Sequence, residues 1–334
     1  MTTFIVRRLA SLVLTLLGGF TVLFILFFAL PGDPAELMAG GGNKNPSPAV
    51  VAAIREKFHL NDSVAEQYVR RLGETVTLSG TSYQTKEPVR DVVADRLPNS
   101  LRLAVWAIAI EITVGVGFGV LSARRRNSFA DYASTLSAVV MSAIPVFVLA
   151  YLLKQVTGVY AFQHNWPEAL RMPPIGIGPE KWFLGIIPGS TEQFKFLIQP
   201  ALILASVSTA IVARLTRTTV LEASTMDHVR TARSKGLSDG EVTRRHILRN
   251  ALIPVVTFLG IDFGTLVGFA VLTETVFDWP GLGSKVARAA SSGDLPVVLA
   301  LSMVVMLVYG LANLIVDVSY AWLDPRIRRN GGAR

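Results

Sequence analysis

Residues 9–30 read LASLVLTLLGGFTVLFILFFAL, an apolar run that contains no charged side chain. A helix needs about 20 predominantly apolar residues to cross a hydrocarbon core of about 30 Å. The run is also longer than the roughly 7–15 apolar residues of a secretory signal peptide. It therefore predicts a membrane-spanning helix that acts as an uncleaved anchor.

Five further apolar runs of comparable length follow along the chain. They cover residues 101–121, 132–156, 197–213, 252–273 and 297–322. Of the 334 residues, 51% are hydrophobic and only 17% are charged, whereas soluble domains carry about 25% charged residues. We therefore expect an all-α polytopic membrane protein with six transmembrane helices. The chain has no cysteine, which excludes disulfides and thiol chemistry.

Basic side chains in the loops predict the orientation of these helices. Arg7 and Arg8 precede the first run, and Arg124 to Arg126 lie between the second and third runs. A further group from Arg214 to Arg249 lies between the fourth and fifth runs, and Arg326 to Arg329 follow the sixth. This alternation predicts that both termini and the loop 214–250 are cytoplasmic. It also accounts for most of the net charge of +8, so a nucleic-acid partner is not indicated.

The segment 31–98 should then form a small external subdomain. It opens with the turn sequence PGDP at residues 31–34. Ser47 and Pro48 predict the start of one helix. The capping-box spacing of Ser63 and Glu66 predicts the start of a second. The loops 157–196 and 274–296 should lie on the same external side.

Motifs of enzyme and metal chemistry are not found. The four histidines are scattered without metal-ligand spacing, and there is no phosphate-binding loop or nucleophile elbow. The sequence GVGFG at residues 115–119 lies inside the second run, where close helix packing is the better interpretation than nucleotide binding. We therefore expect a protein that is not an enzyme and that binds no cofactor or metal itself.

A second set of glycines predicts close packing in the fifth run. Gly260, Gly264 and Gly268 recur at four-residue spacing and form one smooth stripe on a helix. Such a stripe allows another backbone to approach closely. The partner is either another helix of this chain or a second membrane subunit.

Polar groups within the runs are candidates for a translocation path. Asp262 lies roughly opposite the glycine stripe, and an acid at mid-span usually faces a partner or a watery cavity. Its role is therefore contact with cargo or a structural hydrogen bond, and Glu111 is a weaker case of the same kind. Thr265 and Pro145 complete the possible path, and Pro145 should kink the third helix.

The segment 227–237 reads DHVRTARSKGL and is unusually polar for its surroundings. Asp227 is an N-cap candidate, Gly236 a helix stop, and Leu237 a hydrophobic contact after it. Between them, the helical spacing separates a polar set from an apolar pair, with Arg230, Thr231, Arg233 and Lys235 in the first and Val229 and Ala232 in the second. A basic helix lying on anionic lipid is one interpretation.

A family resemblance supplies the other interpretation. The sequences VRTARSKGL at 229–237, RHILRNALIP at 245–254 and TETVFDWPGLG at 273–283, with LDPRIR at 323–328, resemble the permeases of ABC importers for peptides and nickel. The chain is most similar to the dipeptide/oligopeptide permease "B" subunits. The general importer signature has Glu-Ala-Ala where this chain has Arg230, Thr231 and Ala232, a departure that is usual for the peptide branch.

The resemblance implies a permease core with the type I importer fold. It implies that the helix from Asp227 to Leu237 is a coupling helix in a groove of an ATP-binding subunit, where Val229, Ala232 and Leu237 would fill the groove. Further expected partners are a second related permease subunit, one or two ATPase subunits that bind ATP and Mg, and an external binding protein. Peptides are the expected cargo, with nickel or haem as alternatives.

These observations predict four parts in a multi-pass protein of the bacterial cell membrane. They are the tip and first helix at 1–30, the external subdomain at 31–98, the permease core at 99–322 and a cytoplasmic tail at 323–334. An ion-coupled secondary transporter would need internal repeats, which we do not find. A membrane receptor or scaffold would not need the permease signature.

Overall fold

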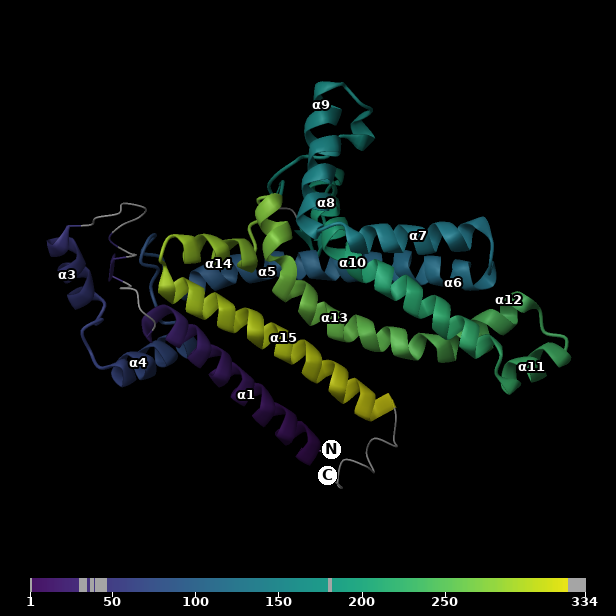
Figure 1. Cartoon of the computed structure of the whole chain (residues 1–334), viewed down its shortest axis with the longest axis horizontal. Coiled ribbons are helices and arrows are strands. Elements are labelled where there is room, and N and C mark those ends of the chain that lie inside the picture. The colour runs from purple at the N-terminus through teal and green to yellow at the C-terminus, as the bar shows by residue number, and fades with distance from the viewer. Residues whose placement is uncertain (1, 30–34, 37–38, 40–46, 180–181, 324–334) are drawn as a thin grey trace. The chain divides into compact units, whose positions relative to one another are not determined.

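The computed structural model describes residues 2–29, 35–36, 39, 47–179 and 182–323 (Figure 1). The PGDP turn at 31–34 and the tail at 324–334 lie outside these residues. Six helical stretches of the described chain are long and apolar enough to cross a membrane, which confirms the expected number. They are Ile5–Phe28, Val89–Arg124, Val146–Gln163, Thr191–Ser224, Asp239–Val276 and Leu295–Val318.

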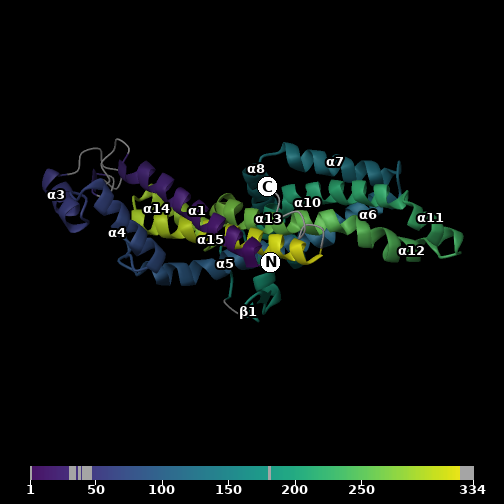
Figure 2. The same cartoon turned by 90° about the horizontal axis from the view of Figure 1, so that it is seen from below.

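The chain divides into two compact units, residues 1–100 with 280–334 and residues 101–279. The first unit contains α1 (Thr2–Phe24), η1 (Ile25–Ala29), α3 (Pro48–Lys57), α4 (Val64–Thr77), the beginning of α5 (Val89–Ile110), α14 (Leu282–Ser291) and α15 (Leu295–Leu323). In this unit α15 packs against α1, α4 and α14, and α1 and α15 lie side by side in both views (Figures 1 and 2).

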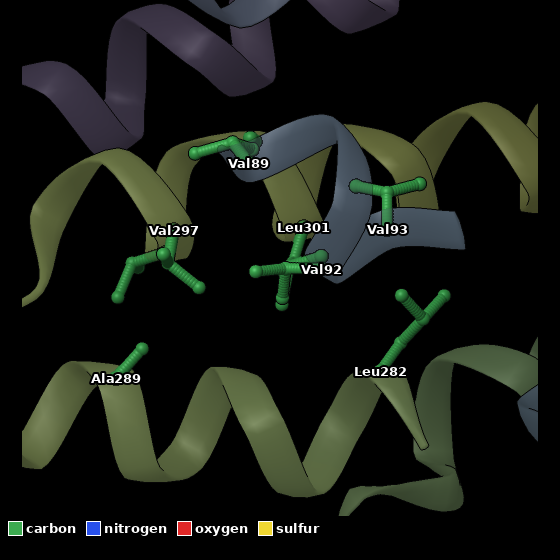
Figure 3. Close-up of a cluster of buried hydrophobic side chains, with 9 residues drawn as sticks. Val89, Val92, Val93, Leu282, Ala289, Val297 and Leu301 are labelled. Carbon is green, nitrogen blue, oxygen red and sulfur yellow. The ribbon is translucent and has the colours of Figure 1, made fainter. Parts of the chain in front are cut away.

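The core of the first unit is a cluster of buried aliphatic side chains (Figure 3). Val89 and Val92 from the start of α5 meet Leu282 of α14 and Val297 and Leu301 of α15, and all five are at most 4% exposed. Burying apolar area contributes about 25 cal/mol per Å². This contact therefore fixes the beginning of α5 against α14 and α15.

Helices α3 and α4 begin as the sequence predicts. Pro48 is the first residue of α3, after Ser47. Ser63 and Glu66 form the expected capping box, in which the Glu66 backbone N–H donates to Ser63 Oγ and the Ser63 N–H donates to Glu66 Oε2 (3.0 Å). Hydrogen bonds from the hydroxyl and backbone of Ser63 lower the pKa of Glu66.

The second unit is built around one long helix, α10 (Thr191–Ser224). The other elements are η2 (Glu111–Val116), α6 (Gly117–Arg124), α7 (Phe129–Ala143), α8 (Val146–Leu153), η3 (Lys154–Tyr160), α9 (Ala161–Gln163), η4 (Glu168–Leu170), α11 (Asp227–Ser234), α12 (Asp239–Val242), η5 (Thr243–Ile247) and α13 (Leu248–Val276), with the rest of α5. Helix α10 packs against α13, α6, η2, α7 and α8 and is drawn between α7 and α13 in Figure 2.

An antiparallel pair of two-residue strands, β1 (Trp182–Phe183) and β2 (Ile187–Pro188), precedes α10. The pair is held to α5, because Trp106 Nε1 donates to the carbonyl oxygen of Ile186 (3.1 Å). The Arg102 guanidinium lies 4.4 Å from the ring centroid of Trp182, a cation–π contact. This part of the loop before α10 is therefore anchored to the second spanning helix.

The third span differs from the expectation of one kinked helix over 132–156. Helix α7 ends at Ala143, and α8 begins at Val146. Between them Ile144 and Pro145 have extended backbones, with ψ of 128° and 133°, and α7 and α8 point in clearly different directions (Figure 1). Pro145 therefore breaks the helix, and the spanning stretch starts after it at Val146.

Candidate functional site: the loop between α10 and α13

Helix α11 lies between α10 and α12 and ends as the sequence predicts. Gly236 follows the last turn with φ of +80°, and its N–H donates to the carbonyl oxygen of Arg233 (2.9 Å). That left-handed conformation favours glycine. The start differs from the expectation, because the N-cap is Met226 and no side chain caps the helix. Asp227 is the first helical residue, where its charge suits the N-terminal end of the helix dipole.

The apolar face of α11 is buried on its own chain. Val229 is 0% and Ala232 is 5% exposed. They join a hydrophobic cluster that is formed by α6, α10, α12, η5 and α13, and Leu237 packs against this cluster. Its other buried members are Ala123, Val220, Ala223, Val242, Ile247 and Ala251. Val229 and Ala232, which were expected to fill a groove of a partner, are thus covered by the chain itself, whereas Leu237 is only half-buried. These side chains hold α11 to the spanning helices.

The polar face of α11 is open to solvent. At 100° per residue, Asp227, Arg230 and Ser234 point away from Val229 and Ala232, and all three are exposed. Arg233 lies on one flank, where its Nε is 3.6 Å from Asp239 Oδ1, an exposed pair that contributes little stability. The face available to a partner is thus polar and carries charges of both signs.

An ion pair with a buried acid, Asp131, fixes neighbouring ends of α6, α7 and α10. Asp131 of α7 accepts from Arg217 Nε (2.7 Å) and Nη2 (2.9 Å) of α10 and from the Asn127 backbone N–H (3.0 Å). The Ser122 hydroxyl of α6 also donates to it. The Arg217 hydrogen bonds, with that from Ser122, hold the pKa of the Asp131 carboxyl well below its usual range. Asp131 therefore stays ionised and ties α7 to α10.

The sequence analysis did not single out Asp131, and it counted Arg217 only as a topology signal. One signal was present, since Asp131 is a lone acid at the boundary between an arginine cluster and an apolar run. Its partner is 86 positions along the chain. Spacing alone cannot identify a pair so distant in sequence.

The intramembrane candidates have different surroundings. Asp262 is 7% and Glu111 is 0% exposed, and Asp262 Oδ2 and both carboxyl oxygens of Glu111 are buried without a hydrogen-bond partner among the described residues. The Thr265 hydroxyl lies 3.4 Å from the Ile261 carbonyl oxygen of its own helix. Of the glycine stripe, Gly264 is buried, whereas Gly260 and Gly268 are half-buried. Pro145 is exposed at the break between α7 and α8.

The GVGFG sequence packs a helix as expected. A Cβ atom at Gly115 or Gly119 would collide with α10, whereas one at Gly117 would meet nothing within 4 Å. The two glycines four residues apart therefore let η2 and α6 approach α10 closely. The prediction of helix packing at this sequence is confirmed.

Phe277 and Trp279, from the sequence TETVFDWPGLG, follow α13. They are 2% and 0% exposed. The Phe277 carbonyl oxygen accepts from the Gly176 N–H (2.9 Å), and the Val276 carbonyl oxygen accepts from Lys154 Nζ (2.7 Å). The motif thus fastens the C-terminal end of α13 to the loop after η4 and to η3.

Family models match both parts of the chain. Residues 115–329 match the inner membrane component of binding-protein-dependent transport systems. Residues 1–104 match the N-terminal region of the membrane components of these systems. The chain belongs to this family. It is a multi-pass permease of a binding-protein-dependent ABC importer, not an enzyme, and such a system works with ATPase subunits and a binding protein.

Individual relatives are similar along their full length. The dipeptide transport system permease protein DppB of Alkalihalophilus pseudofirmus is 36% identical over 338 residues, covering 98% of this chain and 100% of that protein. The oligopeptide transport system permease protein AppB of Bacillus subtilis is 34% identical over 333 residues, covering 98% and 99%. The glutathione transport system permease protein GsiC of Escherichia coli is 32% identical over 329 residues, covering 98% and 99%.

Proposed function

We propose that this chain is a permease subunit for dipeptides or oligopeptides that an external binding protein delivers. The full-length similarity to DppB, AppB and GsiC carries this proposal, because these relatives are named for dipeptide, oligopeptide and glutathione transport. Nickel and haem remain the alternative cargoes of the wider family. A second, related permease subunit and one or two ATPase subunits complete the proposed complex.

Helix α11 is the proposed contact with an ATPase subunit. Its exposed face with Asp227, Arg230 and Ser234 is the surface that a cytoplasmic partner meets. The opposite face is packed into the cluster with α6, α10 and α13. A push on the exposed face is therefore transmitted to the spanning helices with little loss, since close-packed interiors are hard to compress. This arrangement supports alternating access driven by ATP, with both termini and the loop 214–250 in the cytoplasm.

The remaining candidate positions acquire specific proposed roles. Both proposed roles of Asp262 are kept, contact with cargo or a structural hydrogen bond, because this acid is buried and its Oδ2 has no hydrogen-bond partner among the described residues. The exposed break at Pro145 supports a hinge between α7 and α8. We keep Thr265 as a candidate for the path, and Gly260 and Gly268 as candidates for contact with the second permease. The external subdomain and the loops 157–196 and 274–296 are the proposed docking surfaces for the binding protein.

Charge reversal at Arg230 tests the coupling surface. In proteoliposomes containing the complete complex, Arg230→Asp should lower ATP-driven uptake of a radiolabelled dipeptide about tenfold, because like charges in an interface cost several kcal/mol. Arg125→Asp is the matched control, an exposed arginine in another cytoplasmic loop, and should transport at the wild-type rate. Equal uptake by the two variants would contradict the assignment.

The cargo is tested separately. Mass spectrometry of ligands released from the co-purified binding protein should detect short peptides. Recovery of nickel or haem in place of peptides would contradict the cargo assignment. It would leave the assignment of α11 intact.

A further inference from the structure

A cavity of about 680 Å³ opens on one flank of α11, a size that accommodates a small ligand. Its lining comes from α11, η5 and the beginning of α13, and the contributing residues are His228, Arg244, Arg245, His246, Arg249 and Asn250. We call these residues the basic pocket. His228 lies on the opposite flank of α11 from Arg233. The pocket is therefore separate from the outward face proposed to meet the ATPase.

The basic pocket carries positive charge that the described residues do not neutralise. Arg245 is paired with Glu241 (3.0 Å). Arg244 and Arg249 are exposed and have no ion-pair partner within the described part of the chain. No acidic residue lines the cavity. Converging guanidinium groups without a counter-charge favour an anion, and arginine matches the geometry of phosphate oxygens.

The pocket is organised for binding. Asn250 Nδ2 donates to His228 Nε2 (3.2 Å) and lies 3.4 Å from the His246 carbonyl oxygen. His228 Nε2 is 3.4 Å from the same carbonyl oxygen. These contacts connect α11 to the end of η5 and the start of α13. The positions of His228 and Asn250 in the wall of the pocket are thereby set before a ligand arrives.

The position of the pocket relative to the bilayer indicates that a lipid can reach it. The stretch Asp239–Val276 has 38 residues, about 57 Å of helix, against a hydrocarbon core of about 30 Å. Its apolar run begins at Leu252, so Arg249 and Asn250 stand at the level of the lipid headgroups. Arg249, Ile253 and Val256 follow at i, i+4 and i+7 and share one helix face. Ile253 is 58% and Val256 is 60% exposed.

We propose that the basic pocket binds the phosphate headgroup of an anionic phospholipid from the cytoplasmic leaflet. Arg244 and Arg249 pair with the phosphate oxygens, and one acyl chain lies along Ile253 and Val256. An acidic segment of the ATPase would match the charge, but it would leave the adjoining apolar stripe uncovered. Basic pockets beside spanning helices on the cytoplasmic side are suited to anionic headgroups.

The test titrates the full-length chain, purified in detergent, with lipid. Phosphatidylglycerol and phosphatidylcholine of identical acyl chains are compared, and bound lipid is counted by native mass spectrometry. The wild type should retain phosphatidylglycerol in preference to phosphatidylcholine. Arg244→Gln with Arg249→Gln should weaken phosphatidylglycerol binding about 25-fold, from roughly fivefold for each basic side chain. Arg125→Gln with Arg126→Gln removes the same charge from another cytoplasmic loop and should have no effect.

Two further arms identify the source of the phosphate. Glycerol 3-phosphate should bind much more weakly than phosphatidylglycerol, and Ile253→Ser should weaken only the lipid. Equal affinity for the two ligands would overturn the lipid assignment, as would equal losses in the two double-arginine variants or the lack of any preference for phosphatidylglycerol. The same variant is also purified as part of the complete complex. If it loses the ATPase subunit there but keeps the lipid, the pocket binds an acidic protein segment, and the proposal is wrong.

Discussion

Gly119 offers a direct test of how closely α6 and α10 must pack. A Cβ atom built at Gly119 would lie 2.5 Å from Thr216 Cβ and 2.7 Å from the Ala213 carbonyl oxygen. Non-bonded carbon atoms prefer separations of about 3.5–4.0 Å. Because one of these neighbours is backbone, a rotamer change cannot relieve the contact. Gly119→Ala must therefore push α6 and α10 apart by about 1 Å.

The expected cost of this substitution is about 1–3 kcal/mol, the usual cost of overpacking. Gly117 provides the matched control, since it is exposed on the same helix and a Cβ there meets nothing within 4 Å. Both substitutions change helix propensity from glycine to alanine, a gain of about 1 kcal/mol in an α-helix interior. That gain cancels in the comparison, so the difference between the variants measures the steric effect.

The assay is reversible unfolding of the purified chain in mixed micelles with increasing sodium dodecyl sulfate, followed by tryptophan fluorescence and circular dichroism. Gly119→Ala should unfold at a lower detergent fraction than the wild type, and Gly117→Ala at the same or a higher one. The reasoning is refuted if the two variants unfold together, because α6 and α10 would then not require the close approach. Uptake by the complete complex should fall only for Gly119→Ala.

Two other substitutions probe polar contacts. Asp131→Asn should lower the free energy of unfolding in the same assay by about 2 kcal/mol, because Arg217, whose side chain is 30% exposed, loses its charge-assisted hydrogen bonds to the carboxylate. The pKa of Asp131 is lower in the folded protein than in the unfolded chain. The stabilisation from this carboxylate is therefore complete above the unfolded pKa of about 4 and is lost only as the pH falls through the folded pKa. The difference in free energy of unfolding between Asp131→Asn and the wild type should thus stay constant between pH 5 and 8. Asp294→Ala removes the carboxylate that accepts hydrogen bonds from Ser82 Oγ and the Tyr83 N–H. This change should lower the free energy of unfolding by about 3 kcal/mol. Hydrogen exchange around Tyr83 should then accelerate on the order of a hundredfold.

The membrane spans could be predicted because their signal is local. A run such as residues 9–30 is apolar whatever its neighbours are, and its length alone satisfies the bilayer. The break at Pro145 could not be predicted in the same way. A proline in a span removes one backbone hydrogen bond, and contacts from elsewhere decide whether the helix bends or stops. Here Ile144 and Pro145 are extended, and two separate helices result.

Helix α11 shows a second limit on what the sequence alone can predict. Its amphipathic spacing correctly predicts that Val229 and Ala232 share a buried face. The pattern does not tell whether that face is covered by a partner or by the chain itself, since both would be apolar. The family resemblance favoured the partner, and the structure places these side chains against Val220, Val242 and Ile247. The residues free to meet a partner are the polar ones.

Because its apolar face is packed against its own chain, α11 must act differently in its proposed coupling role. If an ATPase bound the apolar face of α11, the transmission of force would depend on the fit between two proteins at that face. A helix whose apolar face belongs to its own chain receives force through its polar face and passes it directly to α6, α10 and α13. Three members of the cluster beneath it are alanines, Ala123, Ala223 and Ala251, and Ala232 of α11 itself is a fourth. Because small side chains allow close approach and have no rotamers to yield, displacement of α11 moves the ends of these helices together.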